Sequence, residues 1–340
     1  MILSDIHTSI AMTKAFLLSK SYIRFSSDIK NNIEKQKGNL YRKEWVFIRL
    51  NRNSRVRLIY NENADILLIP SQDGTYYIQD IITNSIIIKN VQIEKVLAHA
   101  PEQLFFALYK KCSMGCKFCP LSTRIDDAHY SLDLMYSRIK NIKNNEIKSI
   151  SITSSSPPNL STSDVVDEMI FLINKIKNIV NPDIPIGVSV KEPSKEDLSR
   201  LKENGVNEVR LNLEIFNDSL SQKLMPIKNK KNIMKSIAYA CDIFGTGFVS
   251  SNMIIGVGEN DSDLLLGTEA LAKLGAVATL YPYDSIESIN EDFHRPTAER
   301  LYSLAIEQKK IFDKYKIDTS KLKTMCCSCA ASHIFPGKDL

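Results

Sequence analysis

The chain of 340 residues is long enough for one large domain, or for one domain with a smaller appendage. Its net charge of +5, hydrophobic fraction of 44% and charged fraction of 24% are those of an ordinary soluble globular protein. No apolar run reaches the roughly 18 residues that a membrane span needs, which excludes a helical membrane protein.

Residues 1–100 are predicted to form an N-terminal helix followed by a small antiparallel β-rich region. The apolar stretch Met1–Ser19 contains Asp5, His7 and Lys14, so it does not resemble a signal peptide. We therefore expect a cytoplasmic protein whose thiols stay reduced. Turn-forming Asn, Gly and Asp residues separate the β-like runs. These runs are Trp45–Leu50, Val56–Tyr60, Ile66–Ile69, Thr75–Gln79 and Ser85–Ile88.

A basic stretch with interleaved aromatic residues lies inside this region. It comprises Arg42, Lys43, Arg49, Arg52, Arg55 and Arg57, with Tyr41, Trp45 and Phe47. Such a pattern is compatible with RNA binding, because cations hold phosphates and aromatic rings stack on bases. The alternative, which we favour, is the solvated face of two paired strands whose side chains alternate across a sheet.

Three cysteines follow the apolar β-like run Leu104–Tyr109 within one short loop. They are Cys112, Cys116 and Cys119, spaced Cys-x3-Cys-x2-Cys. Three thiolates around one small loop can hold a single metal centre, and a [4Fe–4S] cluster with three protein ligands keeps one iron open. Structural zinc is disfavoured because His99 and His129 do not complete a four-ligand pattern. Seven cysteines and no secretory signal disfavour a disulfide framework.

From residue 101 to about 316 the pattern alternates between strands and helices. The capping-box sequence Ser194–Asp197, a cap at Asp261 and the closing residue Gly245 mark helix ends. A final helix is expected over about Thr297–Tyr315. The strands expected are Leu104–Tyr109, Ser149–Thr153, Ile186–Val190, Val209–Leu213, Phe248–Ile255 and Val277–Leu280. This alternation predicts a parallel sheet with right-handed crossovers, whose functional groups gather at the carboxyl ends of the strands.

The segment 317–340 forms a cysteine-rich tail. A candidate second metal site there consists of Cys326, Cys327, Cys329 and His333. It is compatible with an auxiliary iron–sulfur cluster, or with zinc held by three cysteines and a histidine. Redox-active thiols are a further alternative. Adjacent Cys326 and Cys327 are poorly placed to bind the same iron, and Cys241 is predicted to be a core residue.

The cysteine spacing resembles the signature of the radical S-adenosylmethionine (SAM) superfamily. The resemblance implies an α/β fold with a partial, TIM-like (β/α)6 barrel over residues 101–316. It also implies that SAM chelates the open iron of a [4Fe–4S] cluster, which when reduced cleaves SAM to methionine and a 5′-deoxyadenosyl radical. Short sequences such as Lys191-Glu192-Pro193 and Met225-Pro226 resemble those of a group of radical SAM proteins without a settled substrate. Some members of this group come from nitrilase-associated gene clusters. Biotin synthase-like enzymes are more distant kin.

The resemblance implies cofactor contacts close to the cysteine loop. Phe118 stands where the superfamily usually has an aromatic residue near the SAM adenine. Ser154, Ser155 and Ser156 stand in place of a Gly-Gly-Glu-like segment that meets the methionyl amino group. The carboxylate of that segment is missing here, while small hydroxyl residues and backbone groups are present.

Further cofactor contacts are implied after the third, fourth and fifth strands. Glu192 and Glu214 are candidates for contacts with the ribose or amino group of SAM. Gly256 belongs to the segment Asn252–Glu259, which resembles one whose backbone lies along the adenine, and a glycine allows that close approach.

Together these features predict a radical SAM enzyme that acts on a small molecule in cofactor or metabolite biosynthesis. We expect an electron donor such as flavodoxin or ferredoxin, anaerobic operation, and a barrel mouth covered by the N-terminal region and the tail. One alternative is radical SAM modification of RNA or protein, which depends on the basic stretch. Another is an iron–sulfur electron carrier or a zinc-stabilised binding module. An iron without a protein ligand distinguishes the radical SAM enzyme from an electron carrier, because a carrier binds its cluster with four protein ligands.

Overall fold

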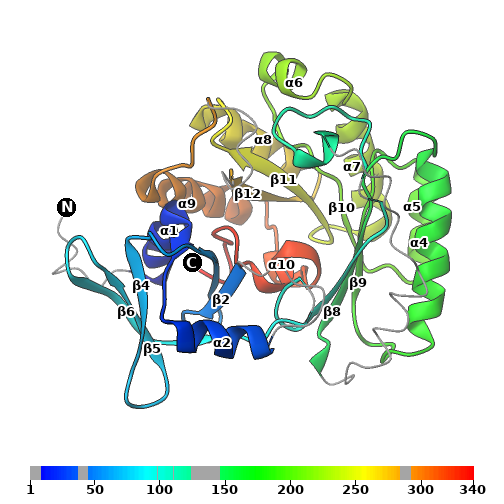
Figure 1. The fold of residues 1–340 in the computed structure, drawn as a ribbon. Coiled ribbons are helices and arrows are strands. Elements are labelled where there is room, and N and C mark those ends of the chain that lie inside the picture. Colours follow the sequence, from blue (N-terminus) through cyan, green and yellow to red (C-terminus); the bar gives the residue numbers. More distant parts are fainter. Residues whose placement is uncertain (1–8, 37–44, 98, 110, 124–145, 284–291) are drawn as a thin grey trace.

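Two six-stranded sheets of different topology divide the chain (Figure 1). The computed structural model describes residues 9–36, 45–97, 99–109, 111–123, 146–283 and 292–340. One sheet belongs to the N-terminal third, and the other is formed by residues 103–282. No helix in these described ranges is long and apolar enough to cross a membrane.

The N-terminal sheet curves until its two edges meet. Its strand order is β1-β3-β2-β6-β5-β4, and all pairs are antiparallel except β1 with β3. Arg24, just after β1, forms a bridge with Leu67 of β4. The elements are α1 (Ile10–Lys20), β1 (Tyr22–Ile23), α2 (Ser27–Gln36), β2 (Trp45–Arg49), β3 (Arg55–Tyr60), β4 (Ile66–Pro70), β5 (Tyr76–Asp80) and β6 (Ser85–Ile93). The predicted β-rich region is therefore a nearly closed sheet.

The second sheet is parallel throughout, with its strands in chain order from β7 to β12. The strands are β7 (Gln103–Ala107), β8 (Ser149–Thr153), β9 (Ile186–Ser189), β10 (Glu208–Arg210), β11 (Val249–Ile255) and β12 (Val277–Pro282). The helices are α4 (Thr162–Lys177), α5 (Lys195–Glu203), α6 (Asp218–Leu224), α7 (Lys230–Phe244), α8 (Asp261–Lys273) and α9 (Ala298–Lys314). The predicted partial α/β barrel is confirmed.

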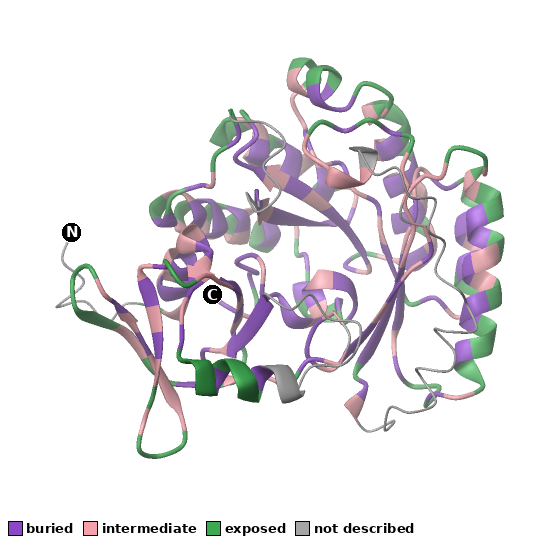
Figure 2. Cartoon of the chain, viewed as in Figure 1, coloured by how far each residue is buried: buried purple, intermediate pink, exposed green. Residues whose placement is uncertain are grey.

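Local sequence signals explain where the barrel helices begin. Ser194 and Asp197 form the predicted capping box of α5, and Ser161 forms another with Asp164 at α4. Asn260, not Asp261, caps α8, because its side chain accepts a hydrogen bond from the backbone N–H of Asp263. Buried side chains follow the strands, and exposed ones lie on the outer face of α4 (Figure 2).

The C-terminal tail forms the floor of the barrel. Its helix α10 (Met325–Cys329) lies between the two sheets (Figure 1). Glu208, the first residue of β10, accepts hydrogen bonds from Lys323 N (2.6 Å), Thr324 N (2.9 Å) and Thr324 Oγ1 (2.6 Å). Met325 N donates to Ser151 Oγ at 2.8 Å, and Gln103, which begins β7, donates to Met325 O at 2.7 Å.

The expectation that this tail covers the mouth of the barrel is therefore wrong. The tail packs at the amino-terminal ends of the strands, opposite the cysteine loop. The reason is Glu208, which is only 3% exposed and needs the buried donors of the tail to satisfy its carboxylate. Gly187 permits this approach, since a Cβ there would lie 1.9 Å from Thr324 Oγ1.

The tail also fastens the N-terminal sheet to the barrel. Arg57 N donates to Ala331 O at 2.8 Å, which joins β3 to the tail. Lys14 on α1 forms an ion pair with Asp339 at 2.6 Å, and both side chains are fully buried. Asp339 also accepts from Ser54 Oγ and from the backbone N–H of Phe335. The pair therefore links three segments that are distant in the sequence.

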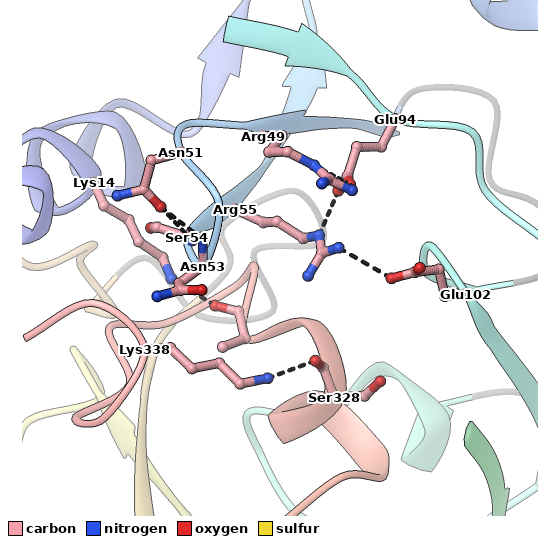
Figure 3. Close-up of polar contacts among 11 residues, drawn as sticks. Lys14, Arg49, Asn51, Asn53, Ser54, Arg55, Glu94, Glu102, Ser328 and Lys338 are labelled. Atoms are coloured by element: carbon pink, nitrogen blue, oxygen red, sulfur yellow. Dashed lines mark hydrogen bonds and ion pairs between the residues drawn. The ribbon is translucent and has the colours of Figure 1, made fainter. Parts of the chain in front are cut away.

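Two arginines of the basic stretch pair with glutamates within the protein (Figure 3), whereas Arg52 is exposed. Arg42, Lys43 and Tyr41 lie outside the described residues. Arg49 and Arg55 both pair with Glu94, and Arg55 also reaches Glu102 at 3.0 Å. The Arg57 guanidinium lies 4.1 Å from the centre of the Trp45 ring.

The two described aromatic residues of this stretch, Trp45 and Phe47, face the core. Trp45 and Phe47 are only 9% and 2% exposed, so their rings are not available to stack on bases. The favoured interpretation as a solvated strand face is therefore correct only in part, because the arginines serve packing and ion pairs as well as solubility.

Replacing Lys14 with Met is expected to lower the free energy of unfolding by about 3–5 kcal/mol, because a buried carboxylate then loses its cation. The matched control is Lys309→Met, which removes an exposed i,i+4 pair with Asp313 and is expected to cost less than about 1 kcal/mol. Urea denaturation measures both. Equal effects of the two substitutions would contradict the anchoring role of the Lys14–Asp339 pair.

Candidate active site

The cysteine loop lies at the carboxyl end of β7 and is held from two sides. On the β8 side, Ser113 N donates to Ser156 O at 2.9 Å, and Ser155 Oγ donates to Lys111 O at 2.5 Å. On the other side, Lys117 N donates to Leu224 O, the last residue of α6, at 2.9 Å. These contacts fix the loop before any metal binds.

The three predicted thiols line one cavity. Cys116 is 5% exposed, and Cys112 and Cys119 are half-buried. Burial raises the pKa of Cys116 to about 11 and also raises the pKa of Cys119. Both thiols are therefore protonated at neutral pH without a metal, and metal binding must release their protons.

This donor set fits a [4Fe–4S] cluster with one iron open to a non-protein ligand. Among the described residues, no three metal-ligating side chains converge on a single ion, as a zinc site requires. In a cubane cluster each thiolate binds a different iron, so the thiols surround the centre without meeting at one point. No other described cysteine lines this cavity, since Cys241 is a core residue of α7, as predicted.

The candidate SAM-contacting residues near the loop share this cavity with the cysteines. Its walls include Phe118, Ser154, Ser155, Ser156, Glu192 and Glu214. The serines also support the cysteine loop, through the Ser155 hydroxyl and the Ser156 carbonyl. The ends of β7, β8, β9 and β10 thus bring together residues that are a hundred positions apart.

Two glutamates in the cavity are held in left-handed backbone conformations. Glu192 has φ 39° and Glu214 has φ 63°, values that are uncommon for residues other than glycine and that cluster at functional sites. Glu192 Oε1 is buried and has no hydrogen-bond partner among the described residues. A buried carboxylate oxygen without a donor fits a ligand that brings its own cation, such as the SAM ammonium group.

Lys228 and Asn212 are cavity residues that sequence reasoning missed. Lys228 Nζ lies 3.9 Å from Glu214 Oε1. Burial raises the pKa of Glu214, and the charge of Lys228 opposes that shift. Asn212 could have been proposed as a cavity residue because it stands two residues before Glu214 on the same strand continuation. Lys228 stands two residues after the Met225-Pro226 pair, which was noted as part of the resemblance.

Gly256 lies near the mouth but does not line the cavity. Its φ is 109°, and a Cβ there would lie 2.0 Å from the backbone oxygen of His294. Glu259 folds back and accepts hydrogen bonds from Gly256 N and Val257 N, each at 2.8 Å. The backbone oxygen of His294 thus leaves no room for a side chain at position 256, and the expected contact of this segment with the adenine stays a prediction.

The candidate second metal site is not assembled. Cys326, Cys327 and Cys329 lie on one short helix, where successive side chains point about 100° apart. Cys326 accepts a hydrogen bond from Arg210 (3.2 Å), Cys327 is in the main core, and Cys329 packs in a separate cluster with Trp45. The three thiols thus lie in three different environments, and no group of three metal-ligating side chains is found among the described residues, so the second metal site stays a prediction.

Comparisons with known proteins agree with this geometry. The model of the radical SAM superfamily matches residues 107–266, a stretch that contains the cysteine loop and strands β8–β11. No curated protein sequence matches the chain.

Solved structures of similar fold include methylornithine synthase (PylB), with a TM-score of 0.50 and 15% identity over 61% of this chain and 62% of that one. The FeFe-hydrogenase maturase HydG from Carboxydothermus hydrogenoformans has a TM-score of 0.51 and 16% identity over 63% and 52% of the two chains. SuiB from Streptococcus suis, bound to its precursor peptide SuiA, has a TM-score of 0.50 and 14% identity over 64% and 47%.

At these identities the likeness establishes a shared fold, and the chain spans less than two thirds of the length of these structures. The superfamily match and the cavity lined by three cysteines nevertheless coincide on the same strands. Residues 107–266 of this chain therefore form a domain of the radical SAM superfamily.

Proposed function

We propose that this chain is a radical SAM enzyme that abstracts a hydrogen atom from a small-molecule substrate. The observation that carries the proposal is the cavity that three cysteine thiols share with the unpartnered carboxylate oxygen of Glu192. When bound there, the cluster and SAM supply an electron and a 5′-deoxyadenosyl radical. A donor such as flavodoxin or ferredoxin provides the electron.

The chain's own residues bind and orient the cofactors. Cys112, Cys116 and Cys119 hold the cluster, and Glu192 accepts a hydrogen bond from the SAM ammonium group. Phe118, at the wall of the same cavity, is in place to pack against an apolar part of SAM. Apolar residues that pack around the loop, including Met114, exclude water from the reacting centre.

A small substrate is favoured over RNA or a protein by the form of the barrel. The tail closes the amino-terminal end, so a substrate that enters from the mouth is enclosed. Two of the arginines that suggested RNA binding, Arg55 and Arg57, are engaged with Glu94, Glu102 and Trp45. We infer kinship with the radical SAM proteins that share Lys191-Glu192-Pro193, and a substrate that belongs to cofactor or metabolite biosynthesis.

Replacing Cys116 with Ala is expected to reduce 5′-deoxyadenosine release to background, because the cluster loses one of its three thiolates. The matched control is Cys241→Ala, which changes a buried cysteine outside the cavity and is expected to keep both iron content and release. Anaerobic reconstitution, dithionite reduction and chromatography of the products measure this. Release by Cys116→Ala at the wild-type rate would contradict the proposal.

Glu192→Gln is expected to weaken SAM binding by roughly 10- to 150-fold, because a hydrogen bond to a charged group contributes about 1.5–3 kcal/mol. Iron content should not change, since Glu192 is not a cluster ligand. Equilibrium dialysis with labelled SAM measures the affinity. The control is Glu196→Gln, an exposed position on α5. An affinity of Glu192→Gln equal to that of this control would contradict the assigned contact.

A further inference from the structure

Strand β10 and the residues that continue it present a column of polar side chains to the barrel interior. Glu208 and Arg210 begin and end β10 and share one face, because alternate residues of a strand do so, and Asn212 and Glu214 follow on the chain that continues it. Asn212 and Glu214 line the cofactor cavity at the top, and Glu208 anchors the tail at the bottom. Arg210 therefore lies in the lumen between the cofactors and the floor.

Arg210 is a cation inside the barrel without a carboxylate partner among the described residues. Its Nη1 donates to Cys326 Sγ at 3.2 Å, and its buried Nε has no hydrogen-bond partner. By contrast, Arg55 and Arg300 each contact two carboxylates. An enclosed guanidinium is costly unless an anion compensates it.

Unpartnered polar groups surround the same part of the lumen. The Tyr281 hydroxyl, which lies close to Cys326, and both ring nitrogens of His333 are buried and lack a well-formed hydrogen bond to any described residue. The centroids of the Tyr281 and His333 rings are 4.5 Å apart. His333 is fully buried, and burial with the nearby Lys14, Lys338 and Arg210 charges lowers its pKa well below the usual value. It is therefore neutral, with one nitrogen that donates and one that accepts.

Three residues at this level keep some accessible surface, since Arg210, Tyr281 and Cys326 are each only partly buried. A cation beside several hydrogen-bonding groups that lack partners is the chemistry that an anion requires.

We propose that Arg210, with Tyr281 and His333, binds an anionic oxygen group of the substrate, a carboxylate or a phosphate, at the floor of the barrel. This inference rests on the proposed function, since it places the substrate between the cofactors and the tail. The anion balances the positive charge of Arg210 and accepts hydrogen bonds from the Tyr281 hydroxyl and from a His333 nitrogen. The cysteine-rich tail thus contributes to substrate recognition.

Cys326 provides a reporter for this site, because its sulfur contacts Arg210. The cluster-loaded protein is treated anaerobically with an equimolar mixture of iodoacetate and iodoacetamide, and peptide mass spectrometry gives the ratio of the two adducts at Cys326. The guanidinium-unfolded chain supplies the reference ratio. We expect the folded protein to favour iodoacetate by about tenfold or more over that reference, because a cationic lumen concentrates anions.

Two substitutions of Arg210 distinguish an effect of its charge from an effect on the structure. Arg210→Lys is expected to keep the preference for iodoacetate, and Arg210→Met is expected to abolish it. If Arg210→Met does not fold, the wild-type ratio and Arg210→Lys still decide. A folded-state ratio equal to the reference would overturn the inference, and so would the absence of labelling by either reagent.

The same preparations are assayed for 5′-deoxyadenosine, so that the two proposals can fail separately. Release of 5′-deoxyadenosine without a preference for iodoacetate overturns only the anion site. A preference for iodoacetate without any SAM cleavage in the presence of bound cluster supports the anion site and counts against the proposed enzyme.

Discussion

The alternation of side chains along strand β10 determines which residues face the interior of the barrel. One face of β10 and its continuation presents Glu208, Arg210, Asn212 and Glu214 to the barrel interior. Glu208 holds the tail, and Glu214 closes the cofactor cavity beside Lys228. A shift of one residue within β10 would turn Glu208 and Arg210 toward the outer helices, so the floor and the lumen depend on the same register.

The seven cysteines perform different tasks because the fold separates them. The loop after β7 keeps three thiols at the mouth, where neighbouring loops hold the backbone in place. The tail keeps three others at the opposite end, where Cys327 and Cys329 pack as small apolar groups and Cys326 faces Arg210. The distance along the barrel axis keeps the tail cysteines away from the loop, so the cluster that we propose there would have three protein ligands.

Much of the barrel was predictable, because its signals are local. The bounds predicted for β8, Ser149–Thr153, are those observed, and the capping box at Ser194 begins α5 as predicted. Glu192 and Glu214 were found by their places after strands, since the carboxyl ends of parallel strands share one edge. The position of the tail was not predictable, because it depends on contacts such as Glu208 with Thr324, 116 positions apart. The partners of Arg49 and Arg55 were missed for the same reason, and Cys326, Cys327 and Cys329 diverge only once α10 is known to be a helix.

The central claim is that the cysteine loop holds one cluster with an iron open to SAM. Electron paramagnetic resonance of the reduced, reconstituted protein, recorded with and without SAM, tests it most directly. The account predicts the signal of a single reduced [4Fe–4S] cluster per chain, whose g values change when SAM is added, because one iron gains new ligands. A signal unaffected by saturating SAM, or the signals of two clusters per chain, would contradict it.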